Sequence, residues 1–502
     1  MRSETPFRKT FLTKALPDLR RASRSDVILL ALWFALNLVL LCFHEPWRDE
    51  AEAFMIARSC GPAGLWQQLS SEGQPLLWFL VLFLPAKLGI PFRLIGVISL
   101  LVCAAAVIRF LRVSPLPRPL TWLILFSPLF MYYNPVISRN YCLALLLCVQ
   151  LIGIRRSRRP RPLALGVTAA LLFQTHLMLA GVALGVTLEL LVGWVSCRRK
   201  RVLAPEIQAY LKGFVVALAG FVFLVLEMLP AFHVIVESLQ YRQLYSFREQ
   251  GMLVFRTLYQ FKDAWVYPFI VFVVFLIPVM ISIPRIYMIY ETIRAERGGT
   301  SGKGLRAAGW LLTVWLGIAV YFYIAIYVRV ANHMQLSLCL MMILLVAVCT
   351  APRARYASYL FLLLCLLGVP RLCVSAYSDL TGAYSQSSAM AEYIREEVPK
   401  DAVITVKSDY YYTPVAARFS SRRGPLFLDL GTGERYVNYV WGFSYPEADL
   451  VAALKENAGS PVYYLTAYAY DHMTSENEME LVFSADGDTI TDEKYYLYRV
   501  KQ

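Results

Sequence analysis

Three kinds of functional site are missing from this sequence. The 10 cysteines lie mostly inside hydrophobic runs and none follows Cys373, so a disulfide framework is not expected. The five histidines include no pair with zinc-type spacing and a third ligand, so no dedicated metal site is predicted. The polar C-terminal part has no glycine-rich phosphate loop of accepted spacing. Neither a disulfide-stapled protein nor a dedicated zinc site is therefore expected, and the C-terminal part is not expected to bind phosphate through a P-loop.

Hydrophobic residues are abundant instead. They make up 58% of the 502 residues, and the mean hydropathy is +0.51. A water-soluble protein usually has an apolar share of about 45–50%. Apolar runs of about 17–25 residues recur between Val27 and Cys373, and each is long enough to cross a bilayer. We therefore expect a multi-pass α-helical protein of the plasma (inner) membrane, with about 11–13 spans.

The net charge of +14 raises the question of a nucleic-acid partner. Most of the excess basic charge lies in short loops between spans, where the positive-inside rule places it, so no nucleic-acid partner is expected. The basic clusters that mark the cytoplasmic side are Arg2–Arg24, Arg109–Arg118, Arg155–Arg161, Arg198–Arg201, Arg294–Arg306 and Arg353–Arg355.

These clusters divide the chain into three parts. Residues 1–26 form a basic cytoplasmic N-terminus, 27–376 a transmembrane domain with outer loops at 45–75 and 230–263, and 377–502 an extracytoplasmic domain. The last part alternates helical and strand patterns, which predicts a small α/β domain that is structural or positions an acceptor. The stretch 75–111 reads as two passes, but two passes would place Arg109 and Arg112 outside. Either one piece is re-entrant or the charge rule fails there.

The acidic loop after the first span carries the strongest chemical signal. It contains Asp49 and Glu50, and a carboxylate in or near hydrocarbon costs about 2.5–3.5 kcal/mol, so it needs a partner or a purpose. Adjacent carboxylates point in different directions, and we predict that one, with Asp49 favoured, acts as a general base for a hydroxyl group. The alternative is a solvated acid or a helix N-terminal charge on the amphipathic segment Ala51–Cys60, which includes Arg58.

Other polar residues fall at predicted outer helix ends. Arg139 and Tyr141 lie at a hairpin tip, where the arginine either binds a lipid phosphate or snorkels to ordinary headgroups. His176 is either a ligand or a packing residue. Arg329 and His333, four apart, either hold a phosphate together or anchor the interface. The remaining candidates are Glu72 and Gln74, which either reach a ligand headgroup or belong to a turn that opens a helix.

Two motifs carry a family resemblance. Trp47-Arg48-Asp49-Glu50-Ala51 after the first span, and Glu72-Gly73-Gln74-Pro75 before the second, resemble the GT-C membrane glycosyltransferases. The chain is most similar to the bacterial family-39-like branch, which is related to protein O-mannosyltransferases and lipid A aminoarabinose transferases. The likeness extends loosely over the whole chain, but only residues 44–78 are specific. Many relatives have His-Pro-Pro where this chain has Gln74-Pro75-Leu76.

The resemblance implies a donor sugar on a polyprenyl phosphate and an acceptor hydroxyl on an unidentified glycan, lipid or protein. The residue matching Asp49 would deprotonate the acceptor, which attacks with inversion, and Glu50 is its catalytic neighbour. Some relatives need a divalent cation (Mg or Mn) and others do not. A transporter or flippase, or an assembly protein, for lipid-linked glycans is the alternative. The residues implied to bind the donor phosphate are Arg139, Arg329, His333 and His176, and those to contact substrate are Glu72, Gln74, Tyr141 and Arg58.

Overall fold

The computed structural model is mostly helical, and it describes a large part of the chain. The described residues are 23–72, 74–157, 159–199, 204–240, 266–296, 303–327, 336–351, 355–406, 412–419, 425–429, 461–467, 469, 479–487 and 493–501. The helices are α2 (Arg24–Phe43), α3 (Arg48–Ser59), α4 (Pro62–Glu72), α5 (Leu77–Lys87), η1 (Phe92–Leu94), α6 (Ile95–Val113), α7 (Arg118–Leu125), α8 (Tyr141–Arg155), α9 (Pro162–Phe173), η2 (Leu177–Leu179), α10 (Ala180–Arg199), α11 (Ala204–Gln240), α13 (Val266–Glu296), α14 (Lys303–Tyr327), α15 (Leu336–Thr350), α16 (Arg355–Leu367), α17 (Val369–Thr381), α18 (Ser387–Glu397) and α19 (Thr413–Ala417).

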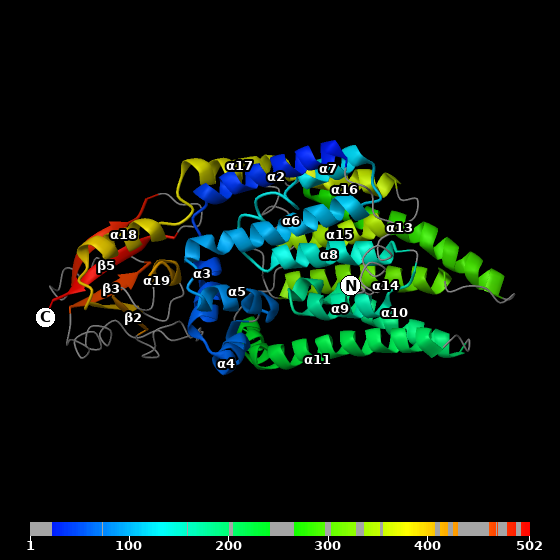
Figure 1. Ribbon diagram of the computed structural model, residues 1–502, viewed down its shortest axis with the longest axis horizontal. Coiled ribbons are helices and arrows are strands. Elements are labelled where there is room, and N and C mark those ends of the chain that lie inside the picture. Colours follow the sequence, from blue (N-terminus) through cyan, green and yellow to red (C-terminus); the bar gives the residue numbers. More distant parts are fainter. Residues whose placement is uncertain are drawn as a thin grey trace, which may run out of the picture.

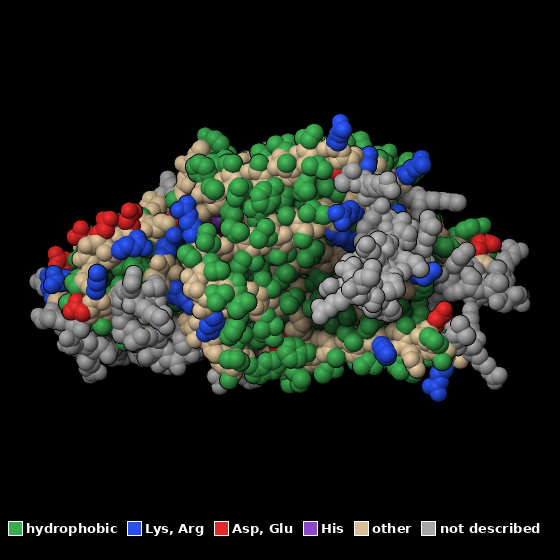
Figure 2. Space-filling view, in the orientation of Figure 1, with side chains coloured by type: hydrophobic (Ala, Val, Ile, Leu, Met, Phe, Trp, Pro, Cys, Tyr) green, Lys and Arg blue, Asp and Glu red, His purple; other side chains and the backbone are tan. Residues whose placement is uncertain are grey.

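A bundle of apolar helices forms the body of the molecule, and the C-terminal domain lies at one end of it (Figure 1). Seven candidate spans among the described residues are long and apolar enough to cross a membrane, and four shorter apolar helices accompany them. Side chains such as Ile28 and Leu226 are 67% and 53% exposed on the bundle surface, where Figure 2 shows a broad hydrophobic belt. Leucines and isoleucines in such a belt are suited to lipid. The expected multi-pass α-helical membrane protein is therefore confirmed.

Helices α2 and α6 run antiparallel. Arg93, just before α6, donates to the carbonyl of Cys42 near the end of α2 (2.9 Å). At the opposite end, Arg118, which follows α6, lies 3.6 Å from Asp26 near the start of α2. We call the end of the bundle where α2 begins the basic end, and the end where α2 finishes the site end.

This arrangement decides the path of residues 75–111. Helix α5 has 11 residues and is about 16 Å long, too short for a hydrocarbon core of about 30 Å. One full span, Phe92–Val113, follows it and brings Arg109 and Arg112 to the basic end. The structure therefore agrees with the first alternative, in which one piece does not cross and the charge rule holds for Arg109 and Arg112.

A single irregular segment, residues 126–140, leads from α7 back to the site end. It lies along α2, where the Trp33 indole donates to the carbonyl of Phe130 (3.1 Å) and Asn37 accepts the N–H of Tyr132 (3.0 Å). Tyr132 has a φ of +58°, the left-handed conformation that a bulky side chain rarely adopts. Non-helical backbone at membrane depth is tolerated where protein buries it, and this segment is almost wholly buried. The outgoing helix predicted before Ser138 is therefore largely irregular chain.

Two predicted boundaries also differ from the structure. Helix α11 continues to Gln240, so the predicted loop 230–263 begins as helix, and residues 241–265 lie outside the described part. Helix α17 continues to Thr381, so the predicted domain boundary after residue 376 falls inside a helix.

The C-terminal domain contains a five-stranded sheet in the order β2-β1-β3-β5-β4. The first three strands in that order are parallel, and β5 pairs antiparallel with both β3 and β4. Helix α18 packs on β4, where the rings of Tyr393 and Phe483 stack 4.2 Å apart. The expected small α/β domain is thus present, and residues 430–460 lie outside the described part. The strands are β1 (Val403–Val406), β2 (Leu426–Asp429), β3 (Val462–Thr466), β4 (Met479–Ala485) and β5 (Tyr495–Val500).

Candidate functional site

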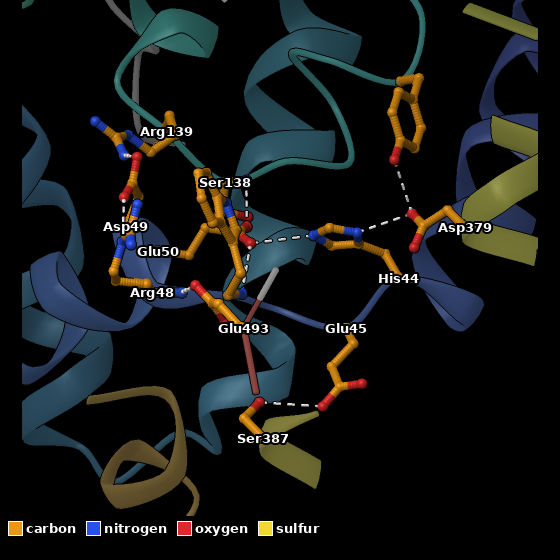
Figure 3. A network of polar contacts seen from close by, with 12 residues as sticks. His44, Glu45, Arg48, Asp49, Glu50, Ser138, Arg139, Asp379, Ser387 and Glu493 are labelled. Atoms are coloured by element: carbon orange, nitrogen blue, oxygen red, sulfur yellow. Dashed lines mark hydrogen bonds and ion pairs between the residues drawn. The ribbon is translucent and has the colours of Figure 1, made fainter. Parts of the chain in front are cut away.

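The acidic loop forms the start of α3 at the site end, and its two neighbouring carboxylates diverge (Figure 3). The Asp49 carboxylate makes an ion pair with Arg139 and lies 3.4 Å from Nε of Arg48. Glu50 points the other way into the protein and is completely buried. Only Asp49, whose side chain keeps 10% of its exposure, is therefore placed to meet a ligand directly.

The buried carboxylate of Glu50 organises the loop around it. It accepts hydrogen bonds from Nε2 of His44 (3.0 Å) and from the backbone N–H of Trp47 (3.2 Å). It also accepts the N–H of Ser138, which lies at the end of the irregular segment 126–140. These contacts join two loops that are distant in sequence, so Glu50 positions the backbone on which Asp49 and Arg139 stand.

His44 bridges Glu50 to the last membrane helix. Its Nδ1 lies 2.8 Å from Asp379 of α17, and Asp379 also accepts the hydroxyl of Tyr132 (3.0 Å). Burial by itself lowers the pKa of His44, but the flanking carboxylates outweigh it and raise the pKa to about 10. The ring is therefore a cation at neutral pH that donates both of its N–H groups, as expected for a histidine between two buried acids.

The C-terminal domain and the acidic loop cap each other's helices. Glu493, just before β5, accepts the N–H of Arg48 at the start of α3 (3.0 Å). In return, Glu45 accepts the N–H of Ser388 in the first turn of α18 (2.6 Å) and pairs with Arg418 (3.0 Å). A carboxylate at a helix N-terminus satisfies free N–H groups and the helix dipole. The domain thus holds in place the helix that carries Asp49.

Glu493 is fully buried, unlike Glu45, the other acid that caps a helix here. Burial raises its pKa to about 7, against the hydrogen bonds and the Arg48 charge that favour ionisation, and the nearby Asp49 charge adds to the increase. The cap therefore changes its protonation state near neutral pH.

A second cluster contains Asn140 and Tyr141, the two residues that directly follow Arg139 in the sequence. Asn140 donates to Gln74 (3.2 Å) and to the carbonyl of Thr175 (2.6 Å). The ring of Tyr141 lies 5.0 Å from that of His176. The structure therefore brings Asp49, Arg139, Gln74, Tyr141 and His176 to one region of the site end, and for Arg139 and His176 it is the end that the basic loops predicted.

The other predicted residues lie elsewhere or outside the described chain. Arg58 donates to the carbonyls of Ala417 (3.1 Å) and Phe419 (2.8 Å) at the end of α19, so it faces the C-terminal domain instead of Asp49. Glu72 is the last residue of α4, and its side chain is not described. Arg329 and His333 lie outside the described residues, so their phosphate-binding role stays a prediction.

Two further acids, Glu189 and Glu227, lie within apolar stretches of the sequence. Glu227 of α11 accepts the N–H of Leu76 (2.9 Å), which holds the Gln74–Leu76 turn against the bundle. Glu189 pairs with Arg155 (2.5 Å) near the basic end. Each glutamate interrupts an apolar run, and a charged residue in such a run indicates a polar partner in the folded chain.

Among the described residues, no group of three His, Cys, Asp or Glu is arranged to hold a metal ion, and the Mg or Mn requirement stays untested.

Neither a protein-family model nor a curated protein matches this chain. Among solved structures it is similar to the crystal structure of ArnT from Cupriavidus metallidurans bound to undecaprenyl phosphate. The two chains share 13% identity with a TM-score of 0.44, over 95% of this chain and 98% of that one. A likeness at this level assigns no residue, substrate or activity to the present chain.

Proposed function

We propose that this protein is a membrane glycosyltransferase that moves a sugar from a polyprenyl-phosphate donor to an acceptor hydroxyl, with Asp49 as the general base. The observation that carries the proposal is the Asp49–Arg139 ion pair at the site end. In the proposal the carboxylate serves as the base for the acceptor hydroxyl and the adjacent guanidinium binds the donor phosphate. The motif resemblance around residues 44–78 points to the same chemistry.

In the proposed reaction the acceptor oxygen attacks the anomeric carbon while its proton passes to the Asp49 carboxylate. The bond between that carbon and the phosphate oxygen breaks, and the lipid phosphate leaves with the electron pair. Direct displacement inverts the anomeric configuration. Arg139 stabilises the negative charge that grows on the phosphate, which is where a fixed cation contributes most to the rate.

The ion pair itself suggests an order of events. Without donor, Arg139 is held by Asp49, and both side chains are about nine-tenths buried, at 11% and 10% exposed. A phosphate headgroup competes for the same guanidinium, and its binding releases the carboxylate toward the acceptor. Donor binding would thus prepare the base, while Glu50 keeps the backbone in place through its buried contacts.

The buried acids disfavour the transporter alternative. A transport pathway is typically lined by ionisable residues near the bilayer middle. Glu189 has an arginine partner, and Glu227 accepts a backbone N–H, so structural contacts account for each.

The basic end carries Arg24 and Arg118, so the positive-inside rule puts the site end on the extracytoplasmic side in this proposal.

The test is a transfer assay with the purified full-length protein and a panel of polyprenyl-phosphate sugars. We expect Asp49→Asn to lower kcat by about 10²–10⁴-fold with donor binding retained. Arg139→Gln should weaken donor binding as well as turnover. Glu396→Gln, which alters an exposed acid on α18, is the matched control and should have no effect.

Three outcomes would contradict the proposal. Asp49→Asn with near-normal turnover would remove the base. A product with retained anomeric configuration would rule out direct displacement. No turnover with any donor, with and without added Mg or Mn, would favour transport or assembly.

A further inference from the structure

A cavity of about 930 Å³ lies where the membrane bundle meets the C-terminal domain. Its walls come from the connection between α5 and α6 on one side and from α18 and the end of α19 on the other. Figure 2 shows Lys and Arg side chains gathered between the hydrophobic belt and the C-terminal domain. The cations that line the cavity are Arg58, Lys87, Arg93, Arg395 and Arg418.

The positive charge of this cavity is poorly compensated. Arg58, Lys87 and Arg93 all donate to backbone carbonyls, which carry no net charge. Among the described lining residues the carboxylate is Glu392, while Arg418 has Glu45 as its partner outside the lining. The cavity therefore presents several cations to a ligand and favours an anion.

The electrostatics of the buried arginines agree with that geometry. Burial lowers the pKa of Arg58. Burial also lowers the pKa of Arg418, and the neighbouring charges of Arg93 and Arg395 lower it further despite the attraction of Glu45. Both shifts come first from burial, which disfavours the charged guanidinium, and a bound anion would oppose them.

The position of the cavity points to a lipid. Leu88, which lines it, is 72% exposed, and the adjacent Leu84 and Leu94 are 64% and 48% exposed. Exposed leucines next to a cationic cavity match the boundary between acyl chains and headgroups. A volume of about 930 Å³ is also ample for a headgroup, since small-molecule sites range over about 300–1,000 Å³.

We propose that this cavity binds the phosphate headgroup of an anionic membrane lipid, with the lipid chains lying along the exposed leucines of the α5–α6 connection. The occupied cavity would fasten the C-terminal domain to the membrane surface. The site uses neither Asp49 nor Arg139, so it stands whether or not the transfer reaction proposed above is correct.

The experiment uses the full-length protein, purified in neutral detergent and stripped of lipid. Native mass spectrometry measures binding of phosphatidylglycerol, of phosphatidylcholine and of inorganic phosphate. We expect phosphatidylglycerol to bind most tightly. Arg395→Gln should weaken it about fivefold and Lys87→Gln by a similar factor, because each cation near a membrane surface contributes to anion attraction.

Two further variants separate this site from general charge effects. Glu392→Gln removes the lining carboxylate and should tighten phosphatidylglycerol binding. Arg499→Gln, an exposed arginine on β5 that does not line the cavity, should leave binding unchanged. Equal binding of the two lipids, or loss of binding in Arg499→Gln alone, would overturn the proposal. Inorganic phosphate that binds as tightly as phosphatidylglycerol would assign the cavity to a free anion and overturn the lipid occupant.

Discussion

The imidazolium of His44 is the sharpest test of how the site is held together. In His44→Gln, the carboxylates of Glu50 and Asp379 remain 0% and 2% exposed but lose the cation between them. Removing one member of a buried ion network costs about 3–5 kcal/mol because the charges left behind are uncompensated. We expect the melting temperature to fall by at least about 5 °C.

The pH dependence has a definite sign. The flanking acids raise the pKa of His44 from 6.5 to about 10, so its stabilising contribution is complete below pH 6.5 and is lost as the pH rises through 10. The melting temperature of the unmodified protein should therefore decline between pH 7 and 10. That decline should be smaller in His44→Gln, which has no imidazole to deprotonate.

Thermal unfolding of the detergent-solubilised protein, followed by intrinsic fluorescence from pH 6 to 10, measures both effects. Tyr132→Phe is the graded control, since it removes one hydrogen bond to Asp379 and should cost about 1 kcal/mol. The double variant His44→Gln/Glu50→Gln should cost less than the sum of its single variants, because the two side chains interact directly. A melting temperature for His44→Gln within about 1 °C of the original, with an unchanged pH profile, would refute this account, because about 1 °C is only a fifth of the smallest shift expected.

Three other predictions use the same unfolding assay, extended down to pH 4 for the first of them. Burial raises the pKa of Glu493 to about 7, so this carboxyl binds a proton more tightly in the folded protein than in the unfolded chain. The free energy of unfolding should therefore fall as the pH rises from 4.5 through 7. Glu493→Gln should flatten that decline, and an identical slope in the variant would contradict this assignment. Arg155→Met should destabilise by about 3 kcal/mol by stranding Glu189, and Arg155→Met/Glu189→Met should recover most of the loss. Gly166→Ala should cost about 1–3 kcal/mol because the added Cβ meets the backbone of Gly213, and an unchanged melting temperature would show that α9 and α11 can separate.

Composition and local pattern were sufficient for the class of the protein. Transfer of an apolar run into a bilayer depends on its own residues, so the spans and the α/β character of the C-terminal domain were predictable from the chain. The divergence of Asp49 and Glu50 was predictable for a similar reason, since neighbouring side chains at a helix start cannot face one point. The basic loops also placed Arg139 and His176 at the same end as Asp49.

Only the tertiary structure determined which groups stabilise the buried charged side chains of the site. Asp379 lies 335 residues from His44, and Glu493 lies 445 residues from Arg48, yet each completes a contact at the site. No local pattern marks such pairs, because the free energy of a buried charge depends on the groups that reach it in the folded chain. The same reason explains the irregular segment 126–140, whose backbone groups are satisfied by local turns and by Trp33 and Asn37 of α2.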